Sequence, residues 1–297
     1  MKKRLCCFIL AFILIAICQA GCGKKDNGMK KVVLNEVAHS IFYAPQYVAI
    51  EMGYFKDAGI DLVLETGFGA DKTMTALISG NADIGFMGSE STIYAYAEGS
   101  KDYAVNFAGL TQRAGNFLVA REKIDNFSWD MVKGKNVLGG RKGGMPQMVL
   151  EYILKANNID PASDLSIDQS VDFGLTAGAF SGNTEYDFTV EFEPGATSLE
   201  KEGKGYVVAS LGVDSGYVPY TAYSAKKSYI EKNPEIIKDF TSAIQKGLDY
   251  VNSHSSAEIA KVIAPQFEDT DIDTITTIVE RYKSQDTWKK DTVFTRE

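Results

Sequence analysis

Three groups of residues in this 297-residue chain could do chemistry or hold a ligand. Glu191 and Glu193 lie two residues apart at the end of a predicted strand, so their carboxylates point to the same side. Glu90 follows a short apolar run and offers a hydrogen-bond acceptor. The glycine-rich segment Gly139–Pro146 precedes a predicted helix. Paired carboxylates suit acid–base catalysis, whereas backbone N–H groups at a helix start suit an anion or another acceptor.

Catalytic partners for these carboxylates are missing from the sequence. All four cysteines lie in the first 22 residues, and the two histidines, His39 and His254, are far apart. The chain therefore has no HExxH motif and no cysteine nucleophile in its body, and no Gly-x-Ser-x-Gly elbow occurs. We expect structural roles for both histidines. The sequence favours a binding protein over an enzyme, with no cofactor and no metal.

The N-terminal segment has the pattern of an export signal. Three basic residues at positions 2–4 precede the uncharged apolar run 5–18, which is shorter than the ~20 residues that span a bilayer. The following Ala-Gly-Cys22 resembles the lipobox of bacterial lipoproteins, with Gln19 in place of the usual aliphatic residue. We predict a signal peptide over 1–21 and lipidation at Cys22. Signal cleavage near Ala20 without lipidation is the alternative.

The remainder of the chain is acidic. Without the basic signal residues, Asp and Glu exceed Lys and Arg by eleven. Such a chain repels polyphosphate, so we expect no nucleic-acid partner. It is also repelled by an anionic membrane surface, so attachment would depend on the lipid at Cys22. Residues 22–29 are small, polar and charged, and we interpret them as a tether between lipid and fold.

Strands and helices alternate along most of the chain, which is the pattern of an α/β protein. The predicted strands cover 31–36, 60–65, 82–87, 103–110, 116–121, 136–140, 188–192 and 206–211. The predicted helices begin near residues 45, 71, 90, 146, 234 and 273. Ligands of open α/β sheets lie at the carboxyl ends of strands. The turns at Phe42-Tyr43, at 67–71 and at 88–90 should therefore converge on a ligand.

Two segments, YVAIEMGYFKDAGIDLVLE (47–65) and ALISGNADIGFMG (76–88), resemble the substrate-binding proteins of ABC importers. The family is the one that takes nitrate, alkanesulfonates, taurine and thiamine-pyrimidine precursors. The later segments 132–161, 187–196 and 233–251 agree in content and order, so the resemblance covers about residues 30 to 285.

The resemblance implies an α/β, two-lobed, periplasmic-binding-protein-like fold of type II with a ligand cleft between the lobes. Lobe one would comprise 30–113 and 222–297, and lobe two 120–216. The hinge crossings would fall near 112–119 and 217–224. Carried over by position, the implied ligand-binding residues are Asn35, Phe42, Tyr43, Ala70, Ser89, Glu90, Gln112, Arg113, Gly143, Gly144, Met145, Phe192 and Glu193.

The residues at these positions suit a flat heterocycle better than a small oxyanion. Aromatic faces and carboxylate acceptors would hold an aminopyrimidine, whereas a sulfonate, taurine or nitrate needs cations such as Arg113, Arg141 and Lys142. The predicted protein is a monomeric, exported lipoprotein on the outer face of the cytoplasmic membrane. Its partners would be a small-molecule ligand and the importer's permease and ATPase.

Two other classes of protein compete with this interpretation. Pyrimidine synthases of thiamine biosynthesis are enzymes that resemble the same family, but they are intracellular and carry a cysteine-rich motif. A ligand-sensing receptor module would need a transmembrane or signalling segment after the fold. The sequence features argue for the binding lipoprotein.

Overall fold

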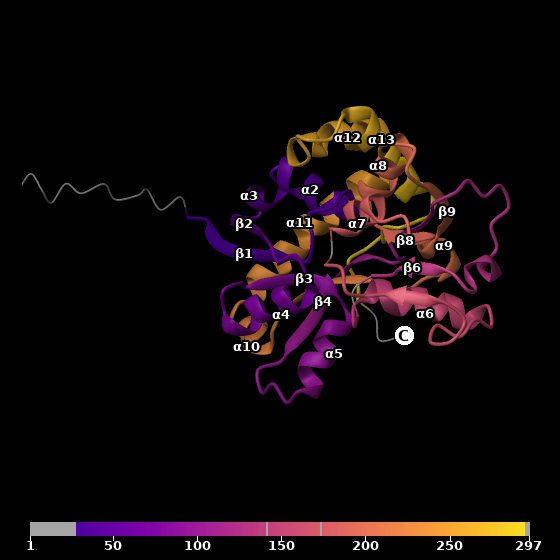
Figure 1. Cartoon of the computed structure of the whole chain (residues 1–297). Coiled ribbons are helices and arrows are strands. Elements are labelled where there is room, and N and C mark those ends of the chain that lie inside the picture. Colours follow the sequence, from indigo (N-terminus) through magenta and orange to yellow (C-terminus); the bar gives the residue numbers. More distant parts are fainter. Residues whose placement is uncertain (1–27, 141, 173, 295–297) are drawn as a thin grey trace, which may run out of the picture.

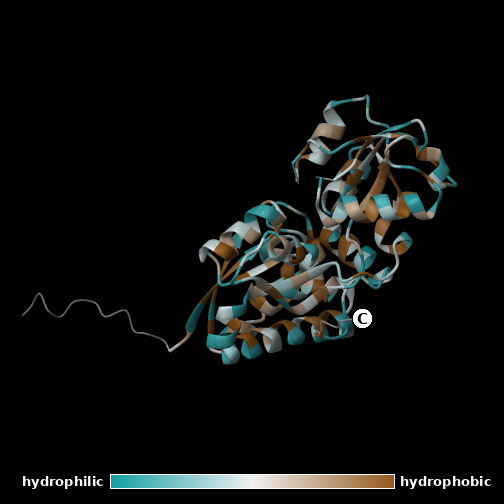
Figure 2. Ribbon diagram, turned by 90° about the horizontal axis from the view of Figure 1, so that it is seen from below, coloured by the Kyte–Doolittle hydropathy of each residue, from teal (hydrophilic) through white to brown (hydrophobic). Residues whose placement is uncertain are grey.

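The structure is a computed structural model that describes residues 28–140, 142–172 and 174–294. It contains two five-stranded sheets of the same kind of topology. Figure 1 shows the strands of both sheets with helices packed around them, and Figure 2 shows two bodies joined by connecting segments. The predicted signal peptide, the predicted lipidation site Cys22 and Arg141 lie outside the described residues.

The first sheet has the strand order β2-β1-β3-β10-β4. Its strands are β1 (Lys30–Glu36), β2 (Ile60–Thr66), β3 (Ile84–Gly88), β4 (Ala104–Thr111) and β10 (Thr221–Lys226). β1 pairs in parallel with β2 and β3, whereas β10 pairs antiparallel with β3 and β4. The parallel half places the carboxyl ends of β1, β2 and β3 at one edge, where the sequence predicts a ligand.

The second sheet has the strand order β7-β6-β8-β5-β9. Its strands are β5 (Phe117–Ala120), β6 (Asn136–Leu138), β7 (Ser166–Asp168), β8 (Phe188–Glu191) and β9 (Tyr206–Ser210). β6 pairs in parallel with β7 and β8, and β5 pairs antiparallel with β8 and β9. In each sheet, the strand with antiparallel neighbours on both sides is the first strand after a crossing from the other sheet.

Helices cover both sheets. Those associated with the first sheet are η1 (Ile41–Tyr43), α2 (Ala44–Glu51), α3 (Tyr54–Asp57), α4 (Ala70–Ser79), α5 (Glu90–Ala97), α10 (Lys227–Lys232), α11 (Pro234–Ser253), α12 (Ser256–Ile263), η3 (Ala264–Gln266) and α13 (Ile272–Ser284). Those associated with the second are η2 (Trp129–Val132), α6 (Met145–Ala156), α7 (Thr176–Gly182), α8 (Gly195–Lys201) and α9 (Leu211–Asp214). No helix in the described ranges is both long and apolar enough for a membrane crossing.

The longest described helix, α11, forms because its apolar residues recur with the helical period. Pro234 opens it, and one face is buried, with the apolar residues Ile236, Phe240, Ile244, Leu248 and Val251. α11 packs closely on α2, since a Cβ at Gly247 would lie 2.1 Å from the Pro45 carbonyl oxygen. This contact holds α2 in place, and with it the segment between β1 and α2.

Two crossings join the sheets. The first crossing, residues 112–116, runs from β4 to β5, and the second crossing, residues 215–220, runs from α9 to β10. The segment after α13 lies against β4: Trp288 pairs with Thr111, and its indole Nε1 donates to the Phe42 carbonyl at 2.8 Å. The chain therefore holds the first crossing and η1 in fixed positions relative to each other.

Candidate ligand-binding site

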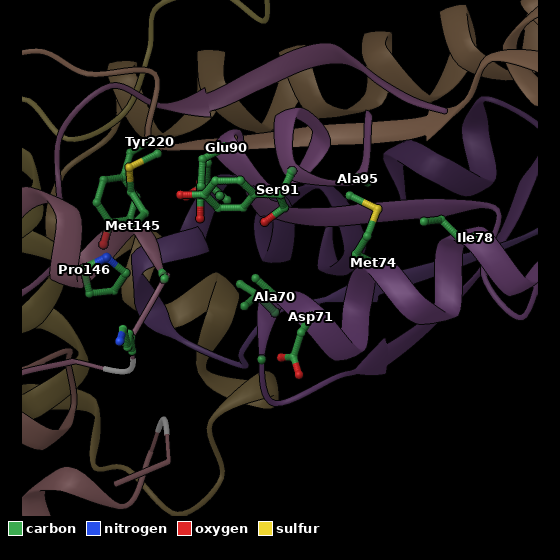
Figure 3. Close-up of a pocket in the computed structure, with 18 of the residues that line it drawn as sticks. Ala70, Asp71, Met74, Ile78, Glu90, Ser91, Ala95, Met145, Pro146 and Tyr220 are labelled. Atoms are coloured by element: carbon green, nitrogen blue, oxygen red, sulfur yellow. The ribbon is translucent and has the colours of Figure 1, made fainter. Parts of the chain in front are cut away.

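A cavity of about 660 Å³ lies where the strand ends of the first sheet face the start of α6. Seven of the predicted ligand residues line it: Tyr43, Ala70, Glu90, Gly143, Gly144, Met145 and Phe192. In the view of Figure 3, Tyr220, Met145 and Pro146 lie at one end, and Ala95 and Ile78 at the other. Both sheets thus contribute to the wall of one cavity.

Glu90 is the most unusual polar group in this wall. It begins α5 directly after β3, and only 5% of its surface is exposed. Its Oε2 atom is buried without a hydrogen-bond partner. Burial raises the pKa of the Glu90 carboxyl to about 7, against the lowering effect of the backbone N–H groups of Glu90 and Met145. A buried acceptor without a partner costs stability, so a ligand group can fill this need.

Gly88 makes room for this carboxyl. A Cβ at Gly88 would lie 2.2 Å from Glu90 Oε2 and 2.5 Å from Oε1. The Glu90 side chain can therefore fold over the end of β3 only because residue 88 has no side chain.

Tyr220 is a second buried polar group without a partner at the cavity. It lies at the end of the second crossing, 3% exposed, and its hydroxyl has no hydrogen-bond partner. Ser89 fixes this segment, because its Oγ donates to the Pro219 carbonyl at 2.5 Å and its backbone N–H donates to the Tyr220 carbonyl at 3.3 Å. Burial raises the pKa of Tyr220 well above its usual value, so the phenol remains a neutral donor.

Tyr43 reaches the cavity because a buried network holds the segment after β1. Glu36, fully buried at the end of β1, accepts hydrogen bonds from Gln46 Nε2 at 2.7 Å and Tyr47 hydroxyl at 2.9 Å. His39 Nδ1 lies 2.8 Å from Glu36 Oε1, and its Nε2 lies 2.8 Å from the Gln266 carbonyl. These contacts give His39 the expected structural surroundings, and Tyr43 packs edge-on against Phe86 with ring centres 4.5 Å apart.

The loop before α6 supplies the opposite wall. Gly143 has a φ of 83°, a backbone conformation that favours glycine, and its N–H donates to Gln147 Oε1 at 2.5 Å. Gly144 is the N-cap of α6, and Pro146 lies in its first turn. The glycine-rich loop therefore brings backbone and the Met145 side chain to the cavity, as a close ligand approach requires.

The remaining predicted residues have other surroundings. Phe42 is fully buried and packs against Tyr220 and Phe192 with ring centres 5.6 and 5.7 Å away. Gln112 Nε2 donates to the Asp286 and Trp288 carbonyls, and Arg113 donates to the Gly212 carbonyl. None of the following lines this cavity: Asn35, Phe42, Ser89, Gln112, Arg113 and Glu193. Asn35 and Ser89 lie in or beside strands that reach it, at the end of β1 and just after β3.

Glu193 has its hydrogen-bond capacity filled by protein groups. Its Oε1 accepts from Arg281 at 2.6 Å and from the Thr197 hydroxyl at 2.9 Å, and its Oε2 accepts from the Thr197 N–H. Glu191, also buried, accepts from the hydroxyls of Thr189 at 2.6 Å and Thr176 at 2.8 Å. The paired carboxylates are thus part of the local structure.

Among the described residues, the charged side chains that line the cavity are mainly acidic. Three described carboxylate residues line the cavity, Asp71, Glu90 and Glu98, and Lys142 is the one described cation among the lining residues. Within residues 28–140, 142–172 and 174–294, no cluster of three or more His, Cys, Asp or Glu side chains is placed to hold a metal ion.

Two sheets of this topology around a shared cavity define the periplasmic-binding-protein fold. The chain belongs to the NMT1/THI5-like family, whose model matches residues 41–257. It is 48% identical over 280 residues to binding protein YtlA of Bacillus subtilis (strain 168), covering 94% of this chain and 83% of that protein.

Two more distant proteins are also similar. One is 4-amino-5-hydroxymethyl-2-methylpyrimidine phosphate synthase of Candida albicans (strain WO-1), 24% identical over 72% of this chain and 64% of that protein. The other is the alkanesulfonate-binding protein SsuA from Xanthomonas axonopodis pv. citri, solved with MOPS bound. Its structure matches with a TM-score of 0.70 at 14% identity, over 86% of this chain and 84% of SsuA, and shows the fold.

Proposed function

We propose that this chain is the substrate-binding component of an ABC importer and that its ligand is a small planar heterocycle, an aminopyrimidine of the thiamine-precursor type. The main observation in support of this ligand is a pair of buried polar atoms at the cavity that lack hydrogen-bond partners, Glu90 Oε2 and the Tyr220 hydroxyl. Family membership and the relative named as a binding protein support a binding role.

The chemistry of Glu90 matches an aminopyrimidine edge. Such a ring presents a nitrogen acceptor beside an exocyclic amine donor. A protonated carboxyl donates to the ring nitrogen and accepts from the amine, and an ionised carboxylate accepts from both when the ring is protonated. With a pKa of about 7, Glu90 has access to both forms near neutral pH. Tyr43 and Phe192 offer aromatic faces to the same ring.

A sulfonate, taurine or nitrate anion is the second candidate. The SsuA structure with bound MOPS favours it, as does the glycine-rich start of α6. Against it stands the acidic wall, because an anion beside Glu90 is repelled whenever that carboxyl is ionised. We therefore expect anions to bind more weakly than aminopyrimidines.

An enzyme related to the pyrimidine synthases is the candidate from another class. The Candida albicans relative carries that name, but every cysteine of the present chain lies within its first 22 residues. The cysteine-rich motif expected of those enzymes therefore has no counterpart in the body of this chain. We infer binding without turnover.

The proposed location is the outer face of the cytoplasmic membrane, with a lipid on Cys22 as anchor. The proposed partners are a permease and an ATPase subunit, and the proposed state in solution is a monomer. The same proposal divides the fold into lobe one, 30–113 with 222–297, and lobe two, 120–216. A Cys22→Ser variant should be released from membranes into the soluble fraction, and retention would contradict the anchor.

Isothermal titration calorimetry of the protein after unfolding and refolding tests the ligand class. Refolding removes any ligand that co-purifies. We expect saturable binding of 4-amino-5-hydroxymethyl-2-methylpyrimidine, with taurine and nitrate at least tenfold weaker. Tighter binding of either anion would overturn the proposed ligand and favour the second candidate. Consumption of the pyrimidine during incubation would instead support the enzyme.

A further inference from the structure

We propose that the ligand carries an uncharged apolar arm, which lies in a channel between α4 and α5 beside the ring site at Glu90 and Tyr220. The channel is lined by Ala70, Met74, Ile78, Tyr94 and Ala95. This inference rests on the proposed function and adds a second part to the ligand, so that the bound molecule has a polar ring at one end and a hydrocarbon or aryl arm at the other.

The size of the cavity is the first argument. A volume of about 660 Å³ equals that of roughly twenty water molecules at ~30 Å³ each. An aminopyrimidine with two small substituents has only about ten non-hydrogen atoms, near the lower end of the 300–1,000 Å³ sites that bind small molecules. A ring at Glu90 and Tyr220 therefore leaves a large part of the cavity to something else.

The direction of the unfilled space is the second argument. Ala70, Met74 and Ile78 are spaced by four residues along α4, so they form one row on the side of the helix. At 1.5 Å per residue this row extends about 12 Å from the start of the helix. α5 packs beside α4 and adds Ser91, Tyr94 and Ala95. Figure 3 shows Met74, Ala95 and Ile78 extending away from Glu90.

The chemistry of the channel is the third argument. Met74 is 7% exposed, and its flexible thioether side chain can adapt to different shapes. Ile78 and Tyr94 remain 41% and 49% exposed although they border the cavity. An apolar arm would bury these faces, whereas a charged arm would lose hydration without gaining a partner at Met74 or Ala95. Charged and polar residues border the cavity again at Glu98 and Ser100, beyond Ala95.

Calorimetric titration with a graded series of ligands tests the channel. The probes are 4-amino-2-methylpyrimidine and its derivatives with ethyl, butyl or hexyl chains at carbon 5, and a parallel series with the chain at carbon 2. Each methylene that enters an apolar site should tighten binding about fourfold. We expect this gain in at least one series until the channel is full.

Two tryptophan variants locate the arm. Ala95→Trp fills the channel and should remove the gain from the longer chains while the unsubstituted ring still binds. Ala97→Trp is the matched control, because Ala97 is exposed on the same helix and does not line the cavity. It should leave the whole series unchanged.

The outcomes separate this inference from the proposed function. Binding of the ring without any gain in either series would overturn the arm channel and leave the proposed function standing. A gain that survives Ala95→Trp would also overturn it, because the arm would then lie elsewhere. Failure of every pyrimidine to bind, with taurine or nitrate binding instead, would overturn both.

Discussion

The ends of β3 and β8 occupy equivalent places in two sheets of matching strand order, yet they treat their carboxylates in opposite ways. After β3, Glu90 is buried with Oε2 lacking a partner. At the end of β8, Glu191 is held by two threonine hydroxyls and Glu193 by Arg281 and Thr197. The same topology thus yields one strand end with an open acceptor at the cavity and one whose carboxylates are hydrogen-bonded by protein groups.

Hydrogen-bond partners distinguish the two kinds of buried acid at these strand ends. All three carboxyl groups have raised pKa values with burial as the largest cause, so the pKa alone does not distinguish them. Their partners do. A carboxyl whose acceptors are filled by its own protein stabilises the fold, whereas one with an empty acceptor at a cavity is available to a ligand.

The largest effect on stability should come from removing the cation beside Glu193, just after β8. Arg281 bridges Glu193 at 2.6 Å and Glu200 at 2.8 Å, and Glu193 is buried. Arg281→Met leaves that carboxyl without its cation, which costs about 3–5 kcal/mol for a buried pair. Urea unfolding should show the loss. Adding Glu193→Gln to this variant should restore most of the stability, and a cost below 1 kcal/mol would show that the pair is not structural.

A somewhat smaller effect on stability should follow from the titration of Glu90, just after β3. Glu90 has a pKa of about 7 when folded and about 4.5 when unfolded, so the folded protein keeps a proton that the unfolded chain releases between these values. Its contribution to the free energy of unfolding is therefore present at low pH and is lost as pH rises from about 4.5 to 7, by roughly 3 kcal/mol.

Glu90→Gln should remove this contribution. Relative to the parent, the variant should gain stability as pH rises through that window, and Glu268→Gln at an exposed position should not. Glu191, with a pKa of about 7, retains a slope of the same sign in both proteins. Parallel pH profiles for Glu90→Gln and the parent would refute the assignment of the buried proton to Glu90.

The residues at these strand ends also show how much of the site could be predicted from the sequence. Tyr43 and Glu90 were predicted because each follows a strand, and parallel strands gather such residues at one edge, whereas Met145 and Phe192 were implied by the family resemblance. The α/β alternation that gave those strand ends is confirmed, and α13 begins at Ile272, where a start near residue 273 was expected. Local pattern and the family resemblance together therefore predicted residues of the cavity wall.

Long-range contacts set what the pattern could not. Tyr220 was missed because it precedes β10, a strand not predicted from the sequence. It is held there by the hydrogen bond from Ser89 to the neighbouring Pro219 carbonyl, 130 residues away along the chain. Glu193 receives Arg281 from α13 across 88 residues. Phe42 follows a strand as expected, but Gly115 leaves space for it to pack inward, since a Cβ there would lie 2.4 Å from its ring.

Alanine substitutions at one glycine near each strand end should have the next largest effects, here on ligand affinity. Gly88→Ala places a Cβ 2.2 Å from Glu90 Oε2, so the carboxyl must turn away, whereas Gly195→Ala leaves 3.1 Å to Glu191 Oε2. We expect Gly88→Ala to weaken binding of 4-amino-5-hydroxymethyl-2-methylpyrimidine about tenfold, the loss of one ligand hydrogen bond of ~1.4 kcal/mol. Calorimetry should show a smaller change for Gly195→Ala, and equal effects would contradict the distinction.

The smallest effect should come from the hydrogen bond that joins the two sides. Ser40 Oγ, buried beside η1, donates to the Glu193 carbonyl at 3.0 Å and so ties the end of β8 to the first sheet. Ser40→Ala should lower the free energy of unfolding by about 1 kcal/mol, because a buried acceptor loses its donor. Thermal unfolding without ligand measures this directly. If stability is unchanged but pyrimidine affinity falls, the bond belongs to the ligand-bound arrangement, and the end of β8 contributes to binding after all.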